Sequence, residues 1–225
     1  MINELLWFGL MIFCYLAVLL IYKLFGRKGL FAWVAMSIIL ANIQVMKTIQ
    51  IFCLVTAEGN IVYSSIFFVS DILNEVYGKK EAKKAVFVGF FILVMMTVIM
   101  QVTLMFIPDS SDTMAPHLAA IFGFMPRIAL ASLTAYICSQ MYDVWMYAFI
   151  KKYHGRKFLW FRSNISVILS QLIDNTMFTL IAFYGIFTWD IILQIYVTSL
   201  MLKVIVSFVD TPFLYWARNI KPEDD

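Results

Sequence analysis

Apolar stretches of eighteen or more residues recur along this chain and are separated by short polar segments. A helix of that length crosses the hydrocarbon core of a bilayer, and its backbone groups find their hydrogen-bond partners within the helix. The composition agrees, because 63% of the residues are hydrophobic and only 14% are charged. The sequence therefore predicts an all-α polytopic membrane protein with a single transmembrane domain over residues 1–225.

Seven membrane-spanning helices are predicted when the chain is scanned for apolar segments of about 20 residues. We expect them to pack as one compact bundle. The third segment carries Asp71, Asn74 and Glu75, so we expect this span to be short or partly re-entrant. The predicted spans cover residues 5–24, 31–57, 61–76, 86–107, 127–150, 163–185 and 191–216.

Basic and acidic residues alternate from loop to loop. Lysine and arginine follow the first, third, fifth and seventh spans. The other loops contain no lysine or arginine, and their acidic residues are Glu58, Asp109, Asp112 and Asp190. The positive-inside rule then places the N-terminus outside and residues 217–225 in the cytoplasm as a tail. The net charge of +3 is small and lies in these loops. The lipid bilayer is therefore the expected partner, and no nucleic acid is expected to bind.

A polar pattern occurs twice at mid-span, as Ser139-Gln140-Met141-Tyr142-Asp143 and as Ser170-Gln171-Leu172-Ile173-Asp174. Residues three or four apart share a helix face, so the amide and the carboxylate of each pattern point the same way. Lys203 falls near the centre of the last span, and Lys47 near the middle of the second. A charge at the bilayer centre costs about 2.5 kcal/mol or more, so such residues usually mark a substrate or ion path. These residues predict a central polar cavity.

A structural role is the alternative for each of these groups. Neutral polar side chains in membrane bundles often form interhelical hydrogen bonds, and buried charges often form structural ion pairs. Asp210 precedes Thr211-Pro212, where a proline frees a carbonyl and kinks a helix. A role for Asp210 at the kink therefore competes with a role at a binding site.

Motifs of catalysis and metal binding are absent from the sequence. It contains no His-Glu-x-x-His, no Gly-x-Ser-x-Gly and no glycine-rich phosphate loop. The three cysteines, Cys14, Cys53 and Cys138, show no paired spacing, so neither a zinc site nor a disulfide is predicted. We expect no enzyme activity, no metal and no cofactor. An intramembrane enzyme and a purely structural bundle partner are the weaker alternatives.

A string at the end of the third predicted span carries a family resemblance. Residues 70–82, Ser-Asp-Ile-Leu-Asn-Glu-Val-Tyr-Gly-Lys-Lys-Glu-Ala, resemble the signature of the queuosine precursor transporter family, which is grouped with the vitamin uptake transporters. The resemblance covers residue 31 to the C-terminus, so it implies a transporter core of six helices at 31–216 and an additional N-terminal span at 1–28. Further matches occur at residues 127–132, at Ser139-Gln140 and Asp143, at Asn164, at Ser170-Gln171 and Asp174-Asn175, and at Lys203 with Thr211-Pro212.

The resemblance implies uptake of a 7-deazapurine across a bacterial inner membrane. The candidate substrates are 7-cyano-7-deazaguanine, 7-aminomethyl-7-deazaguanine and, as in some members, queuine or the nucleoside. We expect the substrate to bind at a polar site near the midplane and to move by alternating access. A substrate-binding subunit of an ATP-driven vitamin importer is the alternative. A homodimer and an external ATPase module are the protein partners considered.

The chemistry of a deazaguanine suits the polar residue types in these spans. A carboxylate can accept from its adjacent N–H donors, an amide or ammonium can donate to its carbonyl, and aromatic rings can stack on the flat base. We assign Asp143 or Asp174 to the guanidine-like edge, and Lys203 to the carbonyl oxygen or to holding a carboxylate ionised. The carbonyl and pyrrole edges are assigned to Gln140, Gln171 or Asn175.

The expected site has two parts. Carboxylates near the cytoplasmic end suit an inner gate or a proton-coupling role, whereas the mid-span groups suit substrate binding. The expected gating or coupling residues are Asp71, Asn74, Glu75 and Asp210. The expected substrate-binding residues are Asn42, Lys47, Gln140, Asp143, Trp145, Gln171, Asp174, Asn175, Phe178 and Lys203.

Overall fold

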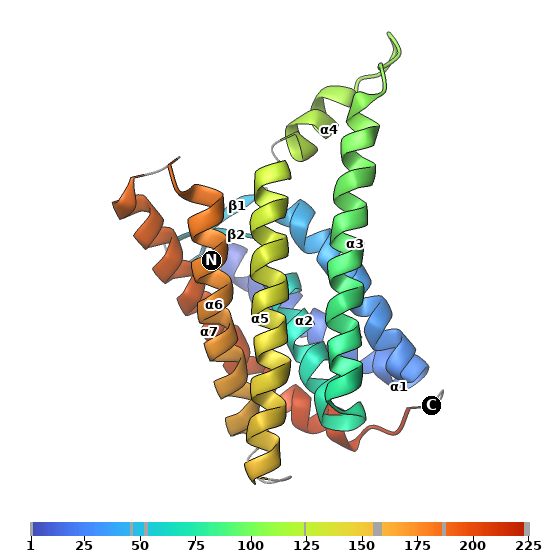
Figure 1. The fold of residues 1–225 in the computed structure, drawn as a ribbon, viewed down its shortest axis with the longest axis vertical. Helices are drawn as coiled ribbons and strands as arrows, with labels where there is room; N and C mark the ends of the chain where they lie inside the picture. The colour runs from blue at the N-terminus through green and yellow to red at the C-terminus, as the bar shows by residue number, and fades with distance from the viewer. Residues whose placement is uncertain are drawn as a thin grey trace.

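Long helices lie beside one another and form an elongated bundle (Figure 1). The fold is that of a computed structural model, which describes residues 2–45, 47–51, 54–123, 125–154, 159–185 and 188–222. The elements in chain order are α1 (Ile2–Gln44), β1 (Thr48–Ile51), β2 (Leu54–Ala57), α2 (Asn60–Ile72), the π-helical segment η1 (Leu73–Tyr77), α3 (Lys79–Met105), α4 (Ala115–Phe122), α5 (Met125–His154), α6 (Leu159–Phe183) and α7 (Trp189–Asn219).

Helix α1 contains a break at Gly26, whose φ of 52° and ψ of −137° are not helical. Glycine adopts a positive φ without the steric penalty that a Cβ brings, so the chain can change direction there. The half before the break corresponds to the first predicted span. The half after it corresponds to the beginning of the second.

The prediction of a helical span over residues 31–57 is wrong beyond Gln44, where α1 ends. The strands β1 and β2 pair antiparallel, with Thr48 opposite Ala57 and Ile51 opposite Leu54. This segment is rich in Ile, Val and Thr, whose branched side chains favour strands, and hydropathy does not distinguish apolar strands from the end of a helix. Lys47 therefore lies beside the strands, and its predicted mid-span position is wrong.

Helix α2 is short, with 13 residues, and all of them except Asn60 and Tyr63 are buried. It continues into η1, after which Gly78 turns the chain with a φ of 85°. The helix packs against α1, α5 and α7. Its polar side chains therefore face other helices rather than lipid.

Four helices are long and apolar enough to cross a membrane, judged by length and composition over the described residues. They are α1, α3, α6 and the part of α7 from Ile192 to Asn219, and the bent pair of α4 and α5 adds a fifth if it counts as one span. The chain is thus an all-α, multi-pass membrane protein. The total of seven spans stays a prediction. By length and composition α1 counts as one span although it is broken at Gly26, and α2, with 13 residues, is too short to count.

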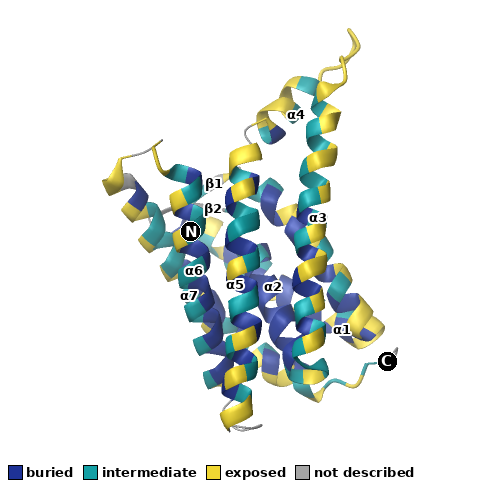
Figure 2. Cartoon of the chain, in the orientation of Figure 1, coloured by how far each residue is buried: buried dark blue, intermediate teal, exposed yellow. Residues whose placement is uncertain are grey.

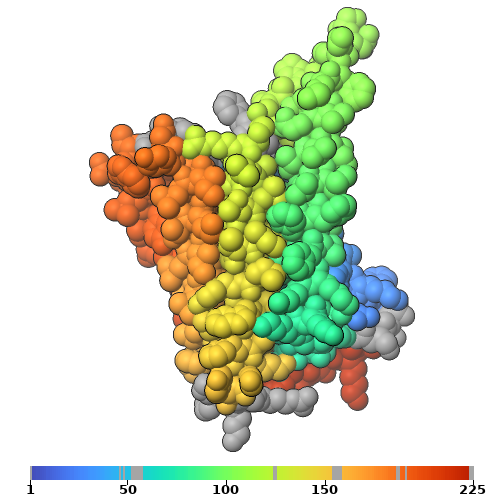
Figure 3. Space-filling view, in the orientation of Figure 1, coloured from blue at the N-terminus to red at the C-terminus, as the bar shows by residue number. Residues whose placement is uncertain are grey.

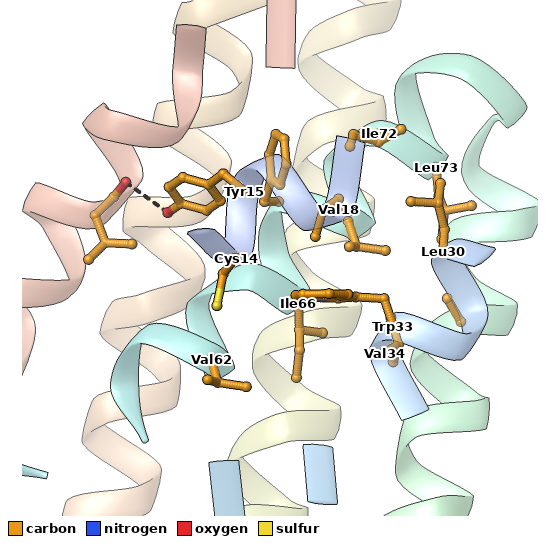
Figure 4. Packing of buried hydrophobic residues seen from close by; sticks show 14 of the residues in the cluster. Cys14, Tyr15, Val18, Leu30, Trp33, Val34, Val62, Ile66, Ile72 and Leu73 are labelled. Carbon is orange, nitrogen blue, oxygen red and sulfur yellow. Dashed lines mark hydrogen bonds between the residues drawn. The ribbon is translucent and has the colours of Figure 1, made fainter. Parts of the chain in front are cut away.

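The apolar core lies where α1 folds back on itself and meets α2. Figure 4 shows Tyr15 and Val18 from the first half of α1, Trp33 from the second half and Ile66 from α2 in one buried cluster. The indole Nε1 of Trp33 donates a 2.9 Å hydrogen bond to Ser65 Oγ. This contact satisfies the polar atom of a large side chain that the core encloses.

The outer surface of the bundle is apolar as well. Helices α3, α5 and α6 lie side by side on one face (Figure 3). Residues coloured as exposed occur along all three helices (Figure 2). On α3, Phe87 and Phe91 are 55% and 63% exposed. Large exposed apolar side chains on long helices are expected where lipid covers the surface.

Candidate functional site

A cavity opens inside the bundle near the end where the two strands lie. It contains about 70 Å³ of space that the centre of a water molecule can occupy. Residues of α1, α2, α3, α5, α6 and α7 line it, so six helices contribute to one site. Its polar or charged lining residues are Asn42, Asn60, Tyr63, Ser132, Tyr136, Asp174 and Lys203, and its apolar ones include Ala135 and Phe178.

An ion pair between Asp174 of α6 and Lys203 of α7 forms part of the cavity wall. Lys203 Nζ lies 2.7 Å from Asp174 Oδ2, and the two side chains are only 4% (Asp174) and 6% (Lys203) exposed. The other carboxylate oxygen, Oδ1, accepts a 2.6 Å hydrogen bond from the hydroxyl of Tyr63 and a 3.1 Å bond from Ser139 Oγ. Asp174 therefore has partners on three other helices, α7, α2 and α5. Its charge is compensated within the wall of the cavity.

Tyr63 contacts both members of this pair. Besides its bond to Asp174, its ring lies under the ammonium of Lys203, with 5.4 Å between Nζ and the ring centroid. A cation over an aromatic face is attracted by the ring quadrupole. An ammonium has three donors. One N–H of Lys203 is used by Asp174, so a ligand in the cavity can accept from the others.

Three more carboxylates are buried outside the cavity lining, one each on α2, α5 and α7. Asp71, Asp143 and Asp210 are at most 2% exposed. Asp71 accepts a hydrogen bond from Ser163, and Asp143 Oδ1 accepts one of 3.4 Å from Ser170. One oxygen of each carboxylate has no hydrogen-bond partner among the described residues. Within that same part of the chain, no group of three or more His, Cys, Asp or Glu side chains is arranged to hold a metal.

Glu75, in the π-helical segment, is surrounded by cations from three helices. Its side chain is 4% exposed and forms ion pairs with Lys151 at 3.2 Å, with Arg162, and with Arg218 at 3.8 Å. Lys151 also donates to the backbone carbonyls of Asn74 at 3.1 Å and Glu75 at 2.6 Å. We call Glu75, Lys151, Arg162 and Arg218 the Glu75 network. It joins η1 to α5, α6 and α7.

The structure brings four of the predicted substrate-binding residues to the cavity, namely Asn42, Asp174, Phe178 and Lys203. Lys47 does not line it; its side chain is 69% exposed and pairs with Glu58 at 3.3 Å. Trp145 lies away from the cavity and is 45% exposed. The remaining four are buried but outside the described lining: Gln140, Asp143, Gln171 and Asn175.

The predicted gating residues lie outside the cavity lining too. Asn74 donates a 3.0 Å hydrogen bond to the carbonyl of Val144, and Glu75 belongs to the Glu75 network. Asp71 and Asp210 are two of the three buried carboxylates described above. A role for these four residues in gating or coupling stays a prediction.

Tyr63 and Tyr136 line the cavity but were not predicted from the sequence. Eight residues separate Tyr63 from Asp71, an offset of about 80° around the helix, so the polar residues of this span did not mark Tyr63. Tyr136 precedes the Ser139-Gln140 pattern by three and four residues. Aromatic residues are abundant in this chain, so neither tyrosine stood out without the three-dimensional fold.

Comparison with known proteins identifies the family. Residues 57–217 match the family described as "Putative vitamin uptake transporter". A relative from Bacillus subtilis, named "Probable queuosine precursor transporter", is 42% identical over 226 residues that cover 100% of this chain and 99% of its own. A protein of the same name from Haemophilus influenzae is 26% identical over 126 residues, which cover 56% of this chain and 51% of its own. No solved structure matches the chain significantly.

The matched region includes most of the cavity. It contains Tyr63, Tyr136, Asp174 and Lys203 but not Asn42 of α1. The full-length match to the Bacillus subtilis relative extends over α1 as well. The chain belongs to the vitamin uptake transporter family, in the queuosine precursor transporter group that its sequence resembles.

Proposed function

We propose that this protein imports a queuosine precursor, a 7-deazaguanine, and binds it in the cavity beside Asp174 and Lys203. The observation that carries the proposal is the buried ion pair in the cavity wall, with Tyr63 bonded to its carboxylate. The two relatives, one matched over nearly its full length and the other over about half, are both named "Probable queuosine precursor transporter". Candidate substrates are 7-cyano-7-deazaguanine, 7-aminomethyl-7-deazaguanine and queuine.

The donor and acceptor groups of the cavity suit this ligand. The guanidine-like edge of a deazaguanine carries adjacent N–H donors, which a carboxylate such as that of Asp174 accepts side by side. The neighbouring ring carbonyl can accept from the ammonium of Lys203. Phe178 and Tyr136 offer aromatic faces to the flat base. In the empty site, Asp174 and Lys203 neutralise each other's charge. A bound ligand would replace part of this pairing with its own hydrogen bonds.

Alternating access is the transport mechanism we propose, with the cavity on the outer side. The beginning of α3, residues 79–84, carries four lysines, and Lys151 and Lys152 lie near the end of α5; both segments lie at the end of the bundle where η1 lies. The positive-inside rule makes that end cytoplasmic, and it makes the N-terminus external for seven spans. The Glu75 network then acts as an inner gate, since its ion pairs hold four helical segments together. Opening it would expose the site to the cytoplasm.

Uptake by the purified protein tests the proposal. The protein is reconstituted into lipid vesicles and offered radiolabelled 7-cyano-7-deazaguanine without ATP. We expect saturable uptake that Lys203→Met abolishes, whereas Lys80→Ala, at an exposed surface position, should transport normally. Saturable binding without uptake would instead favour a substrate-binding subunit that needs a separate ATPase. Absence of both binding and uptake for all three candidate substrates would refute the assignment.

A further inference from the structure

A second, smaller void lies between α1, α2, α3 and α5. Its apolar walls include Val34 and Ile66, both labelled in Figure 4, and its polar residues are Ser70, Tyr136 and Gln140. The void is too narrow to admit a water molecule. No charged side chain is among the described residues that line it.

The three polar residues that line this void carry polar atoms without hydrogen-bond partners among the described residues. Ser70 is 2% exposed, and Tyr136 and Gln140 are 0% exposed. Ser70 Oγ, the hydroxyl of Tyr136 and both Oε1 and Nε2 of Gln140 have no partner within the described part of the chain. Buried polar groups are nearly always paired, so four unpaired atoms around one space need an explanation. A ligand that pairs with them is one explanation, because the void is too narrow for a water molecule to do so.

Tyr136 connects this void to the cavity, because it lines both. Its ring meets that of Tyr63 edge to face, at 6.4 Å between centroids. On the other side a Cβ at residue 89 would collide with the Tyr136 hydroxyl, so Gly89 of α3 makes room for it. The side chain of Tyr136 is therefore a wall that the two spaces share.

We propose that Ser70 and Gln140 form the inner half of the ligand site, reached when the ring of Tyr136 swings aside, and that they bind the pyrrole edge of a free base. A carboxamide donates from Nε2 and accepts at Oε1, which matches an edge where a ring nitrogen acceptor lies next to an N–H donor. A free deazaguanine has such an edge opposite its carbonyl, formed by the pyrrole N–H and the neighbouring pyrimidine nitrogen. The proposal rests on the function proposed above.

This assignment predicts which ligands the protein rejects. A nucleoside carries its ribose on the pyrrole nitrogen, so it has lost the donor and gained bulk at that edge. A site built to hydrogen-bond an N–H discriminates strongly against an analogue that lacks it, because its own polar groups stay unpaired. The protein should therefore take up free bases and exclude the corresponding nucleosides.

The test compares 7-cyano-7-deazaguanine with its derivative methylated at the pyrrole nitrogen, using the detergent-purified protein and Gln140→Leu. We expect wild type to bind the free base at least tenfold more tightly than the methylated base. In Gln140→Leu the free base should bind at least tenfold more weakly than in wild type, and the preference over the methylated base should approach onefold. Such a loss of discrimination is the coupling that a double-mutant cycle measures.

Thermal stability separates a binding role from a structural one. Gln140→Leu and Ser70→Ala remove buried atoms that lack partners, so the ligand-free proteins should melt at or above the wild-type temperature. The matched control is Ser37→Ala, because Ser37 is 0% exposed, its hydroxyl is also without a partner in the described structure, and it lines neither space. We expect Ser37→Ala to bind like wild type.

Three results would overturn the proposal in different ways. If wild type binds the free base but Gln140→Leu keeps wild-type affinity and preference, or melts well below wild type, the inner half-site is wrong and the proposed function stands. If wild type binds none of the deazaguanines, the proposed function fails and this inference fails with it. Equal binding of free and methylated base by wild type would also refute the pyrrole-edge assignment.

Discussion

Lys203 and Asp174 meet across the contact between α7 and α6, with 2.7 Å between the ammonium nitrogen and the carboxylate, and both side chains are almost completely buried. Removing one partner of a buried pair leaves an uncompensated charge and costs about 3–5 kcal/mol, whereas removing both often costs much less. The two residues therefore offer a direct way to separate their contribution to folding from their contribution to transport.

A double-mutant cycle on this pair should distinguish stability from uptake through the behaviour of the double variant. We expect Lys203→Met and Asp174→Asn each to lower the melting temperature and to reduce uptake at least tenfold. The double variant should recover most of the stability, because no lone charge remains, but not the uptake, because the ligand contacts are still missing. Melting in detergent and vesicle uptake are measured for all four proteins. Recovery of both properties would mean that the pair is structural only.

Tyr63→Phe should weaken ligand binding and lower the melting temperature, because the Asp174 carboxylate loses a hydrogen bond that helps to hold it in the cavity wall. The ring under Lys203 is retained, but the hydrogen bond to Asp174 is lost, and bonds to charged groups contribute about 1.5–3 kcal/mol. We expect binding of 7-cyano-7-deazaguanine to fall by about tenfold or more. Tyr184→Phe is the control, since Tyr184 is 61% exposed. Equal affinities for the two variants would remove Tyr63 from the site.

Glu75→Gln should destabilise the end of the bundle where η1 lies. Three cations would then face a neutral amide, so we expect the free energy of unfolding to fall by about 3–5 kcal/mol, as for a broken buried ion pair. Glu81→Gln is the matched control, because Glu81 pairs with Lys84 at 2.6 Å and Arg27 at 3.2 Å near the surface. Exposed pairs contribute about 1 kcal/mol or less. Similar melting temperatures for both variants would argue against the Glu75 network as a gate.

Gly89→Ala should disturb the position of Tyr136. The added Cβ collides with the Tyr136 hydroxyl, and overpacking typically costs about 1–3 kcal/mol. Because phenylalanine lacks that hydroxyl, adding Tyr136→Phe should restore part of the lost stability. Gly9→Ala is the control, since a Cβ there meets nothing within 4 Å. Additive changes in melting temperature would show that the two side chains do not press on each other.

The orientation in the membrane is tested by cysteine labelling in intact cells, in a background in which Cys14, Cys53 and Cys138 are replaced. A cysteine at Asp112, in the loop before α4, should react with a membrane-impermeant reagent added outside. A cysteine at Lys80, after η1, should react only once the cells are opened. Both positions are exposed in the structure. Labelling of the Lys80 position from outside would invert the proposed topology.

Part of the cavity wall could be predicted from the sequence, because charged residues are so costly within apolar segments. Asp174 and Lys203 were singled out as charged residues near mid-span, and both line the cavity. The same reasoning placed Lys47 at mid-span, where the error came from reading residues 48–57 as helix. Apolar side chains are compatible with a strand as well as with a membrane helix, and only pairing between β1 and β2 distinguishes them.

The sequence by itself determined that this chain is a helical, multi-pass membrane protein, because apolar length and the need to satisfy backbone hydrogen bonds leave few other solutions. Its family was also determined by the string at residues 70–82 and is confirmed by the matches to relatives. The tertiary structure alone decided which polar residues meet. Asp143 and Asp174 occupy equivalent positions in the repeated pattern, yet only Asp174 lines the cavity with Lys203. Helix packing sets which partner each buried polar group finds, and neither spacing nor composition contains that information.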